Sequence, residues 1–309
     1  MASSSIEMKH VARGDQPLVG ILWMVVTGLC FVLVTALVKT LGQRVPAAES
    51  AFLRYLMGLV FLVPVWRQLA AVRLSRRQWS MFGLRGLVHA LGVLLWFYAM
   101  SRLPLAEVTA MNYLTPVGVT LLAVLVLGER LAMRRILAIC AALAGAFLIL
   151  RPGFRDLDPG HFAMLGTALL YSGSYLSAKI LSDEVSAVVV VALLSVTVTV
   201  CLAPFAYAQW VPLSLADLGV LFGVACFATA GHYAMTLAFA AAPMTVTQPV
   251  TFLQLVWSVL LGATLFDEAP DPWVITGGCV ILSAVSFITW REARLKRRPI
   301  TPPFPATKV

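Results

Sequence analysis

Long apolar runs alternate with short polar breaks along almost the whole chain. A helix needs about 20 mostly apolar residues to cross a hydrocarbon core of about 30 Å, and most of these runs approach that length. The breaks carry proline, glycine or charged residues, which end or bend helices. The pattern predicts helical segments at 18–39, 48–66, 79–100, 105–127, 136–150, 161–180, 187–207, 217–240, 244–265 and 273–290. We therefore expect an all-α integral membrane protein with ten transmembrane helices.

The two halves of the chain resemble each other. A shift of 139 residues aligns identical residues: Pro104 with Pro243, Val117 with Val256, and Glu129 with Glu268. Because each half has five predicted helices, an odd number, the second half would enter the membrane from the opposite side. We therefore expect two inverted five-helix repeats, residues 18–150 and 161–290, around a central cavity that holds the solute near the midplane.

Composition and charge support a membrane protein and argue against other classes. Of the 309 residues, 60% are hydrophobic and 12% charged, against about 25% charged in soluble domains, and the mean hydropathy is +0.90. The net charge of +9 comes from cations in short loops and tails, so we expect no nucleic-acid partner. The five cysteines lie in apolar runs without metal-ligand or redox spacing, so we expect neither a metal nor a cofactor.

The distribution of Lys and Arg predicts the orientation in the membrane. With the N-terminal tail, residues 1–17, placed inside, 16 of the 23 cations fall on the cytoplasmic side and five on the other. Arg54 and Arg85 lie within predicted helices. Positive loops stay in the cytoplasm, so we expect both tails, 1–17 and the basic 291–309, to be cytoplasmic. The expected location is the inner membrane of a bacterium.

Several short motifs resemble a known transporter family. The first half has Tyr-Leu-Thr-Pro at 113–116 and Leu-Gly-Glu-Arg at 127–130, and the second half has Pro-Val-Thr-Phe-Leu-Gln at 249–254 and Phe-Asp-Glu at 266–268. The chain thereby resembles the EamA-type members of the drug/metabolite transporter superfamily, and within it the YddG-like exporters of aromatic and other neutral amino acids. The resemblance implies export of metabolites or toxic compounds.

The acidic residues restrict the energy source. All 14 Asp and Glu fall in tails, linkers or the first residues of a predicted helix. Ionisable groups at membrane depth are costly and mark ion pathways, so the lack of a carboxylate there argues against a buried Na⁺ site or an acidic proton relay. We expect facilitated exchange, or weak proton coupling that rests on His89 or His232, because histidine changes charge near neutral pH.

Aromatic and hydrogen-bonding side chains at membrane depth are the candidate substrate contacts. They offer an apolar body with a polar tip, which suits an amphipathic or zwitterionic solute, although each could instead serve ordinary helix packing. The candidates are His89, Trp96, Tyr98, Asn112, Tyr113, Tyr171, Tyr175, His232, Gln248, Thr251 and Gln254. Pro116 and Pro249 fall inside the fourth helix of each half, where a bend is typical of a transporter gate.

Two arginines within predicted helices have two readings each. Arg85 lies one turn before His89, so it either contacts a substrate carboxylate or extends to the cytoplasmic boundary. Arg54 either pairs across helices or lines the cavity. Lys39 is expected to anchor the end of the first helix, and Glu129 and Glu268 to cap helices or pair with neighbouring arginines.

The sequence therefore predicts a transporter that exports neutral or aromatic amino acids, or similar amphipathic metabolites and drugs, by alternating access. The alternative is an intramembrane enzyme or a sensor, but no His-Glu-x-x-His motif or other catalytic set lies at depth, and the loops are short. The expected partners are a small-molecule substrate and the lipid bilayer. The oligomeric state stays open, with a monomer as one option.

Overall fold

The computed structural model describes residues 16–127, 133–154, 156–182, 184–242 and 244–296, which form helices and short connections without a β-strand. The first half contains α1 (Pro17–Leu41), α2 (Ala47–Gly58), the 3-10 helix η1 (Leu59–Val65), α3 (Trp66–Ala71), α4 (Arg76–Met100), α5 (Leu105–Asn112), α6 (Thr115–Leu127) and α7 (Met133–Leu150). The second half contains α8 (Pro159–Ser182), α9 (Ala187–Ala208), α10 (Leu215–Ala241), α11 (Met244–Thr247), η2 (Gln248–Thr251), α12 (Phe252–Leu265) and α13 (Pro272–Lys296).

The all-α membrane fold is confirmed. Within the described ranges, eight helical stretches are long and apolar enough to cross a membrane, and they coincide with eight of the ten predicted segments. The predicted segment 161–180 corresponds to α8, which is not among the eight. The segment 244–265 corresponds to α11, η2 and α12, whose apolar part, Pro249–Leu265, is shorter. That all ten segments cross the membrane remains a proposal.

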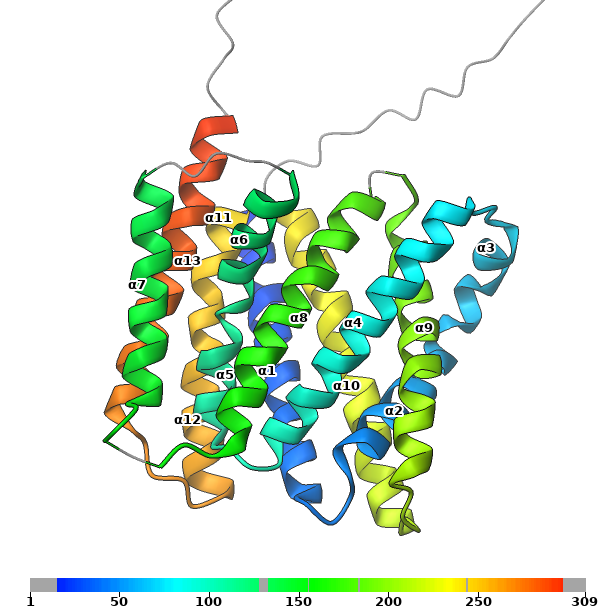
Figure 1. Cartoon of the computed structure of the whole chain (residues 1–309), viewed down its shortest axis with the longest axis horizontal. Coiled ribbons are helices and arrows are strands. Elements are labelled where there is room, and N and C mark those ends of the chain that lie inside the picture. The colour runs from blue at the N-terminus through cyan, green and yellow to red at the C-terminus, as the bar shows by residue number, and fades with distance from the viewer. Residues whose placement is uncertain (1–15, 128–132, 155, 183, 243, 297–309) are drawn as a thin grey trace, which may run out of the picture.

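Helix packing follows a regular scheme (Figure 1). The helices α1 and α10 lie side by side, as do α4 and α8, α7 and α13, and α2 and α9. The first turn of α1 and the last turn of α13 lie at the same end of the bundle, the upper end in Figure 1. Every one of these four contacts joins the two halves of the chain, so neither half has a separate core.

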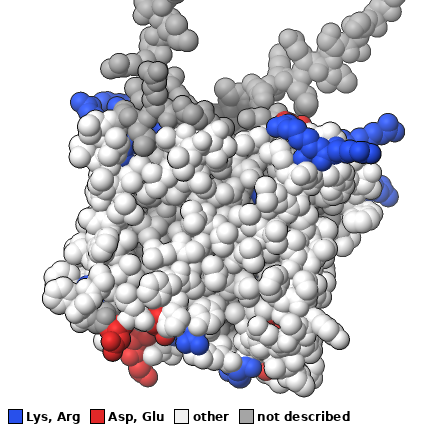
Figure 2. Space-filling view, viewed as in Figure 1, with Lys and Arg blue, Asp and Glu red and all other residues white. Residues whose placement is uncertain are grey.

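The outer surface is that of a protein in lipid. Large apolar side chains point outward, among them Leu22, Leu125, Leu169 and Val200, which are all more than 60% exposed. On the face shown in Figure 2, charged side chains gather at the two ends of the bundle and the flank between them is almost uncharged. Apolar flanks and charged ends are typical of transmembrane bundles.

Matching capping boxes begin the third long helix of each half. Ser75 caps α4 and exchanges hydrogen bonds with Gln78, and Ser214 caps α10 and exchanges hydrogen bonds with Asp217. A capping box satisfies two of the free N–H groups at a helix start. The two boxes are 139 residues apart, which is the shift that aligns the halves. In Figure 1, α4 begins at the upper end of the bundle and α10 at the lower end.

The fourth predicted helix of each half is broken near its proline. Proline has no N–H group, so the carbonyl of Asn112, four residues before Pro116, has no helical donor, and α5 ends at Asn112. In the second half, Pro249 lies in η2 between α11 and α12. The two breaks are joined, because the Tyr113 hydroxyl donates to the Thr251 carbonyl oxygen at 2.8 Å.

A glycine contact sets the separation of α7 and α13. A Cβ added to Gly145 would lie 2.7 Å from the Gly277 carbonyl oxygen, where neither backbone can easily move aside. We expect Gly145→Ala to lower the free energy of unfolding by about 1–3 kcal/mol, as overpacking does. The control is Gly219→Ala, because a Cβ there meets open space and alanine favours a helix by about 1 kcal/mol. Thermal unfolding in detergent measures both, and equal melting temperatures would contradict the close contact.

Candidate functional site

A cavity of about 290 Å³ lies between helices of both halves. Its walls come from α2, η1 and α4 in the first half and from α8, α9 and α10 in the second. The polar and aromatic side chains on these walls include Arg54, Tyr55, Phe61, Arg85, His89, Tyr175 and His232. The volume is near the lower end of the range for small-molecule pockets, so the cavity can hold a small organic solute.

His89 is the most connected side chain of the cavity. Its Nε2 lies 3.1 Å from the Tyr55 hydroxyl on α2, and its Nδ1 lies 3.0 Å from the Ser174 hydroxyl on α8. The imidazole also stacks on the Tyr171 ring, with centroids 4.7 Å apart. Both ring nitrogens thus have hydroxyl partners that can donate or accept. The ring is fixed by contacts from two neighbouring helices, α2 and α8.

Aromatic rings form one wall of the cavity. Tyr171 and Tyr175 are one turn apart on α8 and stack with centroids 5.8 Å apart. Tyr175 is 44% exposed because it faces the cavity, whereas Tyr171 is buried behind it. Trp96 on α4 packs edge-on against Tyr171, with centroids 6.4 Å apart. The wall offers a flat apolar surface to a planar solute.

Two buried arginines face the same cavity. Arg85 donates from Nε to the Ser174 carbonyl at 3.2 Å and from Nη1 to the Val190 carbonyl at 2.9 Å. The Arg54 guanidinium carbon lies 4.0 Å from the Tyr55 ring centroid. The Arg85 side chain is buried against α8 and α9, and both readings of this residue stay predictions. Within the described part of the chain, neither arginine forms an ion pair and no carboxylate lines the cavity.

His232 on α10 completes the cavity. It is exposed to the cavity, and its ring contacts Phe31 of α1 edge-on, with centroids 5.1 Å apart. Three of the predicted site residues, His89, Tyr175 and His232, therefore line one cavity, although they come from three helices.

Apart from Tyr171 and Trp96, which pack behind the aromatic wall, the other predicted site residues lie away from this cavity. Tyr98 lies under the Arg102 guanidinium at 4.6 Å, and Gln254 lies opposite Gly28 of α1. The remaining ones gather around the two helix breaks: Asn112, Tyr113, Pro116, Pro249 and Thr251. The side chain of Gln248 falls outside the described residues, as do Glu129 and the side chain of Lys179. A role for these positions in binding or gating stays a prediction.

The sequence interpretation missed a buried contact between a carboxyl group and a histidine. Glu107 of α5 and His161 of α8 are 2.7 Å apart, between Oε2 and Nε2, and both side chains are about 95% buried. Glu49 of α2 is also buried and accepts a hydrogen bond from the Val211 N–H at 3.1 Å. Glu49 and Glu107 each lie in the first turn of a helix, as the sequence predicts. That position does not predict which distant segment of the chain buries each carboxyl group.

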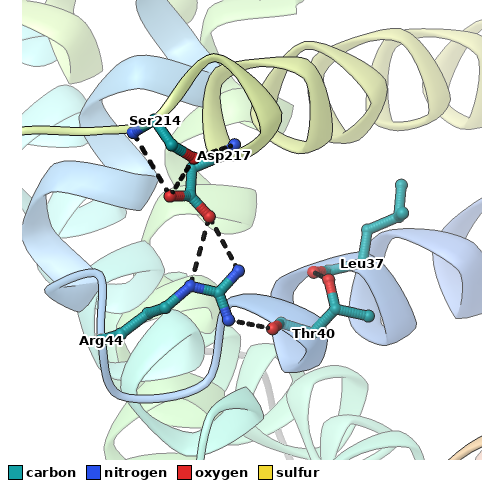
Figure 3. Close-up of polar contacts among 5 residues, drawn as sticks. All are labelled: Leu37, Thr40, Arg44, Ser214 and Asp217. Carbon is teal, nitrogen blue, oxygen red and sulfur yellow. Dashed lines mark hydrogen bonds and ion pairs between the residues drawn. The ribbon is translucent and has the colours of Figure 1, made fainter.

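Ion pairs tie the two halves together at both ends of the bundle. Figure 3 shows Arg44, from the α1–α2 connection, donating from Nε and Nη2 to Asp217 at 3.2 and 2.7 Å. At the other end, Arg77 and Gln78 of α4 donate to Glu184 at 2.7 and 3.0 Å. These hydrogen bonds from Arg77 and Gln78 lower the pKa of Glu184. In both cases a helix cap of one half binds the loop that follows the first helix of the other half.

Relatives of this chain are membrane transporters. A riboflavin transporter of Rhizobium johnstonii is 31% identical over 95% of this chain and 99% of its own length. A pseudopaline exporter of Pseudomonas aeruginosa is 28% identical over 86% of this chain and 94% of its own. An S-adenosylmethionine uptake transporter of Rickettsia prowazekii is 24% identical over 89% and 94%. The chain is thus a multi-pass membrane transport protein and not an enzyme.

The fold and the family agree with these relatives. A crystal structure that is 18% identical matches with a TM-score of 0.57 over 91% of this chain and 97% of the solved chain, so the two share a fold. The EamA-like transporter family matches once in each half, over residues 18–151 and 158–290. The two matches together cover most of the sequence and confirm the resemblance to the EamA-type transporters inferred from its motifs. The chain belongs to the EamA-like transporter family.

Proposed function

We propose that this protein exports neutral or aromatic amino acids, or similar amphipathic metabolites and drugs, across the bacterial inner membrane. The observation that carries the proposal is the cavity between the two halves, with its aromatic wall of Tyr175 backed by Tyr171 and its fixed polar groups. The relatives are named for riboflavin, pseudopaline and S-adenosylmethionine, which are small organic solutes. One is named an exporter and one an uptake transporter, so the direction of transport is part of the proposal.

Alternating access between two inverted five-helix repeats is the proposed mechanism. In the two repeats, α1, α2, α4 and α7 correspond to α8, α9, α10 and α13. The contact of α1 with α10 therefore has its counterpart in the contact of α8 with α4, whereas the contacts of α7 with α13 and of α2 with α9 each join two corresponding helices. The matched caps at Ser75 and Ser214 lie at opposite ends of the bundle, as inverted repeats require. In such a bundle the halves rock about a central site. The ion pairs Arg44–Asp217 and Arg77–Glu184 lie at opposite ends of the bundle. Each pair would then break when the cavity opens at its end and form again when that end closes.

Solute flux tests the function directly. We expect purified protein in proteoliposomes to carry labelled aromatic amino acids faster than protein-free vesicles, by at least about tenfold, because the aromatic cavity lowers the barrier to crossing. The comparison panel contains neutral aliphatic amino acids, sugar phosphates and inorganic cations. Transport of only the last two classes, or of nothing, would contradict the proposal. A sensor without transport activity would bind a member of the panel and show no flux.

Cysteine labelling tests the proposed orientation. We expect Phe154→Cys, in the exposed turn between α7 and α8, to react with an impermeant maleimide in intact cells, because the charge bias places residues 151–160 outside. Arg73→Cys, between α3 and α4, should react only after permeabilisation. Both are made in a variant without the five native cysteines, which serves as the control. Labelling of both positions from the same side would contradict the inverted repeat.

A further inference from the structure

The charge balance of the central cavity is uneven. Arg54 and Arg85 contribute two positively charged guanidinium groups, and His89 and His232 contribute two imidazoles. The cavity walls that the structure describes contain no carboxylate. A charge removed from water is costly unless a partner of opposite sign approaches it. The two guanidinium groups therefore have no anionic partner on the cavity walls, and a negatively charged group of the solute can take that place.

Both guanidinium groups keep hydrogen-bond donors for such an anion. A guanidinium has five N–H groups, and Arg85 uses Nε and Nη1 on two backbone carbonyls. Its Nη2 has no partner among the described residues. The Arg54 guanidinium carbon lies over the Tyr55 ring, and its N–H groups donate to none of the described side chains or carbonyls. An arginine fork matches a carboxylate with two parallel hydrogen bonds, which is a strong and specific pairing.

The aromatic wall lies beside these donors. Tyr175 and His89 line the cavity together with Arg85, and Tyr171 continues the stack behind them. A planar apolar body can lie against the rings while a carboxylate reaches the guanidinium groups. An ammonium group on the same solute would meet two like charges and no acid. Close like charges repel, whichever dielectric constant applies to the cavity.

We propose that the cavity is an anion site formed by Arg54 and Arg85 that selects aryl carboxylates and disfavours an ammonium group next to the carboxylate. This inference rests on the proposed function and narrows it. Of the two charges on an aromatic amino acid, the site binds the carboxylate and tolerates the ammonium group at a cost. An aromatic acid without the amine is then the better ligand, and an aromatic amine without the acid is excluded.

Three matched probes test the charge preference on the purified full-length protein in nanodiscs. They are 3-phenylpropanoate, phenylalanine and 2-phenylethylammonium, which share a phenylethyl skeleton. By calorimetry we expect 3-phenylpropanoate to bind at least about tenfold more tightly than phenylalanine, and 2-phenylethylammonium to show no saturable binding beyond that of empty nanodiscs. Equal affinity for the first two, or tighter binding of the amine, would overturn the proposal.

Substitutions test the two arginines. We expect Arg54→Gln and Arg85→Gln each to weaken 3-phenylpropanoate binding at least about tenfold and to reduce its advantage over phenylalanine. Arg85→Lys keeps the charge but loses the planar fork, so it should lie between wild type and Arg85→Gln. The matched control is Arg73→Gln, whose side chain is exposed in the connection between α3 and α4, and it should bind all three probes as wild type does. Unfolding temperatures show whether each variant is folded.

The outcomes separate this inference from the proposed function. If labelled phenylalanine crosses the proteoliposome membrane but binds as tightly as 3-phenylpropanoate, only the anion preference fails. If no amino acid is transported and none of the three probes binds, the proposed function fails with it. If Arg54→Gln, shown to be folded, binds 3-phenylpropanoate as tightly as wild type, Arg54 is not part of the site and the two-arginine assignment is overturned.

Discussion

Replacing Lys39 by methionine is expected to lower the free energy of unfolding by about 2–3 kcal/mol, because it leaves the Glu268 carboxylate without its cation. Lys39 ends α1 and forms an ion pair with Glu268, which follows α12. Removing one partner of a fully buried pair costs about 3–5 kcal/mol. These two side chains keep 17% and 14% of their surface, so water stabilises the remaining charge in part and the cost is smaller.

The expected loss of stability is large because Lys39 and Glu268 also bind a third segment, the connection between α4 and α5. The Lys39 ammonium donates to the Leu103 carbonyl at 2.7 Å, and Glu268 Oε2 accepts from the Leu105 N–H at 2.9 Å. The pair therefore fixes the connection between α4 and α5 against one helix of each half. Lys39 lies in the last turn of α1, so its ammonium group also interacts favourably with the dipole of that helix.

A double-mutant cycle tests this network. Unfolding of Lys39→Met, Glu268→Gln and the double variant is measured by thermal denaturation in detergent. We expect the double variant to be more stable than the sum of the two single losses predicts, because it leaves no unpaired carboxylate. The comparison pair is Arg77 with Glu184, where Arg77 is 65% exposed, and its coupling should be much weaker than that of Lys39 with Glu268 because water screens exposed charges. Additive losses for Lys39 and Glu268 would show that the two charges do not interact.

The hydrophobic pattern predicts the helices well because lipid imposes one length and one composition on them. The predicted segment 79–100 corresponds to α4, Arg76–Met100. The helix begins three residues earlier than predicted, because the Ser75 cap starts it in a polar stretch that the apolar pattern does not include. The predicted 48–66 corresponds to α2 with η1, Ala47–Val65. The hydrophobic pattern does not show the break at Tyr113, because the residues on both sides of the break are apolar. Only Pro116 indicates that the helix is interrupted there.

The site is predicted only as far as local spacing reaches. Residues one turn apart share a helix face, which is why Arg85 and His89, and Tyr171 and Tyr175, occur together in and behind the cavity. Their partners come from packing between distant helices. Tyr55 is 34 residues before His89, so its hydrogen bond to the imidazole has no signal in the sequence. The same holds for Glu107 and His161, which are 54 residues apart.

Replacing Pro116 or Pro249 by alanine is expected to slow transport on the order of tenfold, which corresponds to about 1.4 kcal/mol in the activation barrier. Alanine restores a backbone N–H group, so the carbonyl four residues earlier can accept a helical hydrogen bond. For Pro116 that carbonyl belongs to Asn112, where α5 ends. The broken helix would then become continuous and lose the bend that we propose as the gate. Gate opening limits the rate of many such cycles.

The two breaks should act as one unit, because the Tyr113 hydroxyl binds the Thr251 carbonyl across them at 2.8 Å. Removing that hydroxyl in Tyr113→Phe keeps the ring and the proline but uncouples the breaks. We expect it to change the transport rate in the same direction as Pro116→Ala and by a smaller factor. The double variant should then be hardly slower than Pro116→Ala, since both changes affect the same movement.

Binding separates a gate from a contact. Neither proline lines the cavity, so the dissociation constant of a transported solute should stay within about twofold of wild type in both variants, while the rate falls on the order of tenfold. The control is Pro272→Ala at the first position of α13, where proline lacks only an N–H that no helical partner would use. It should leave rate and affinity unchanged. If Pro116→Ala weakens binding as much as it slows transport, the proline supports the binding site and the helix break is not the gate.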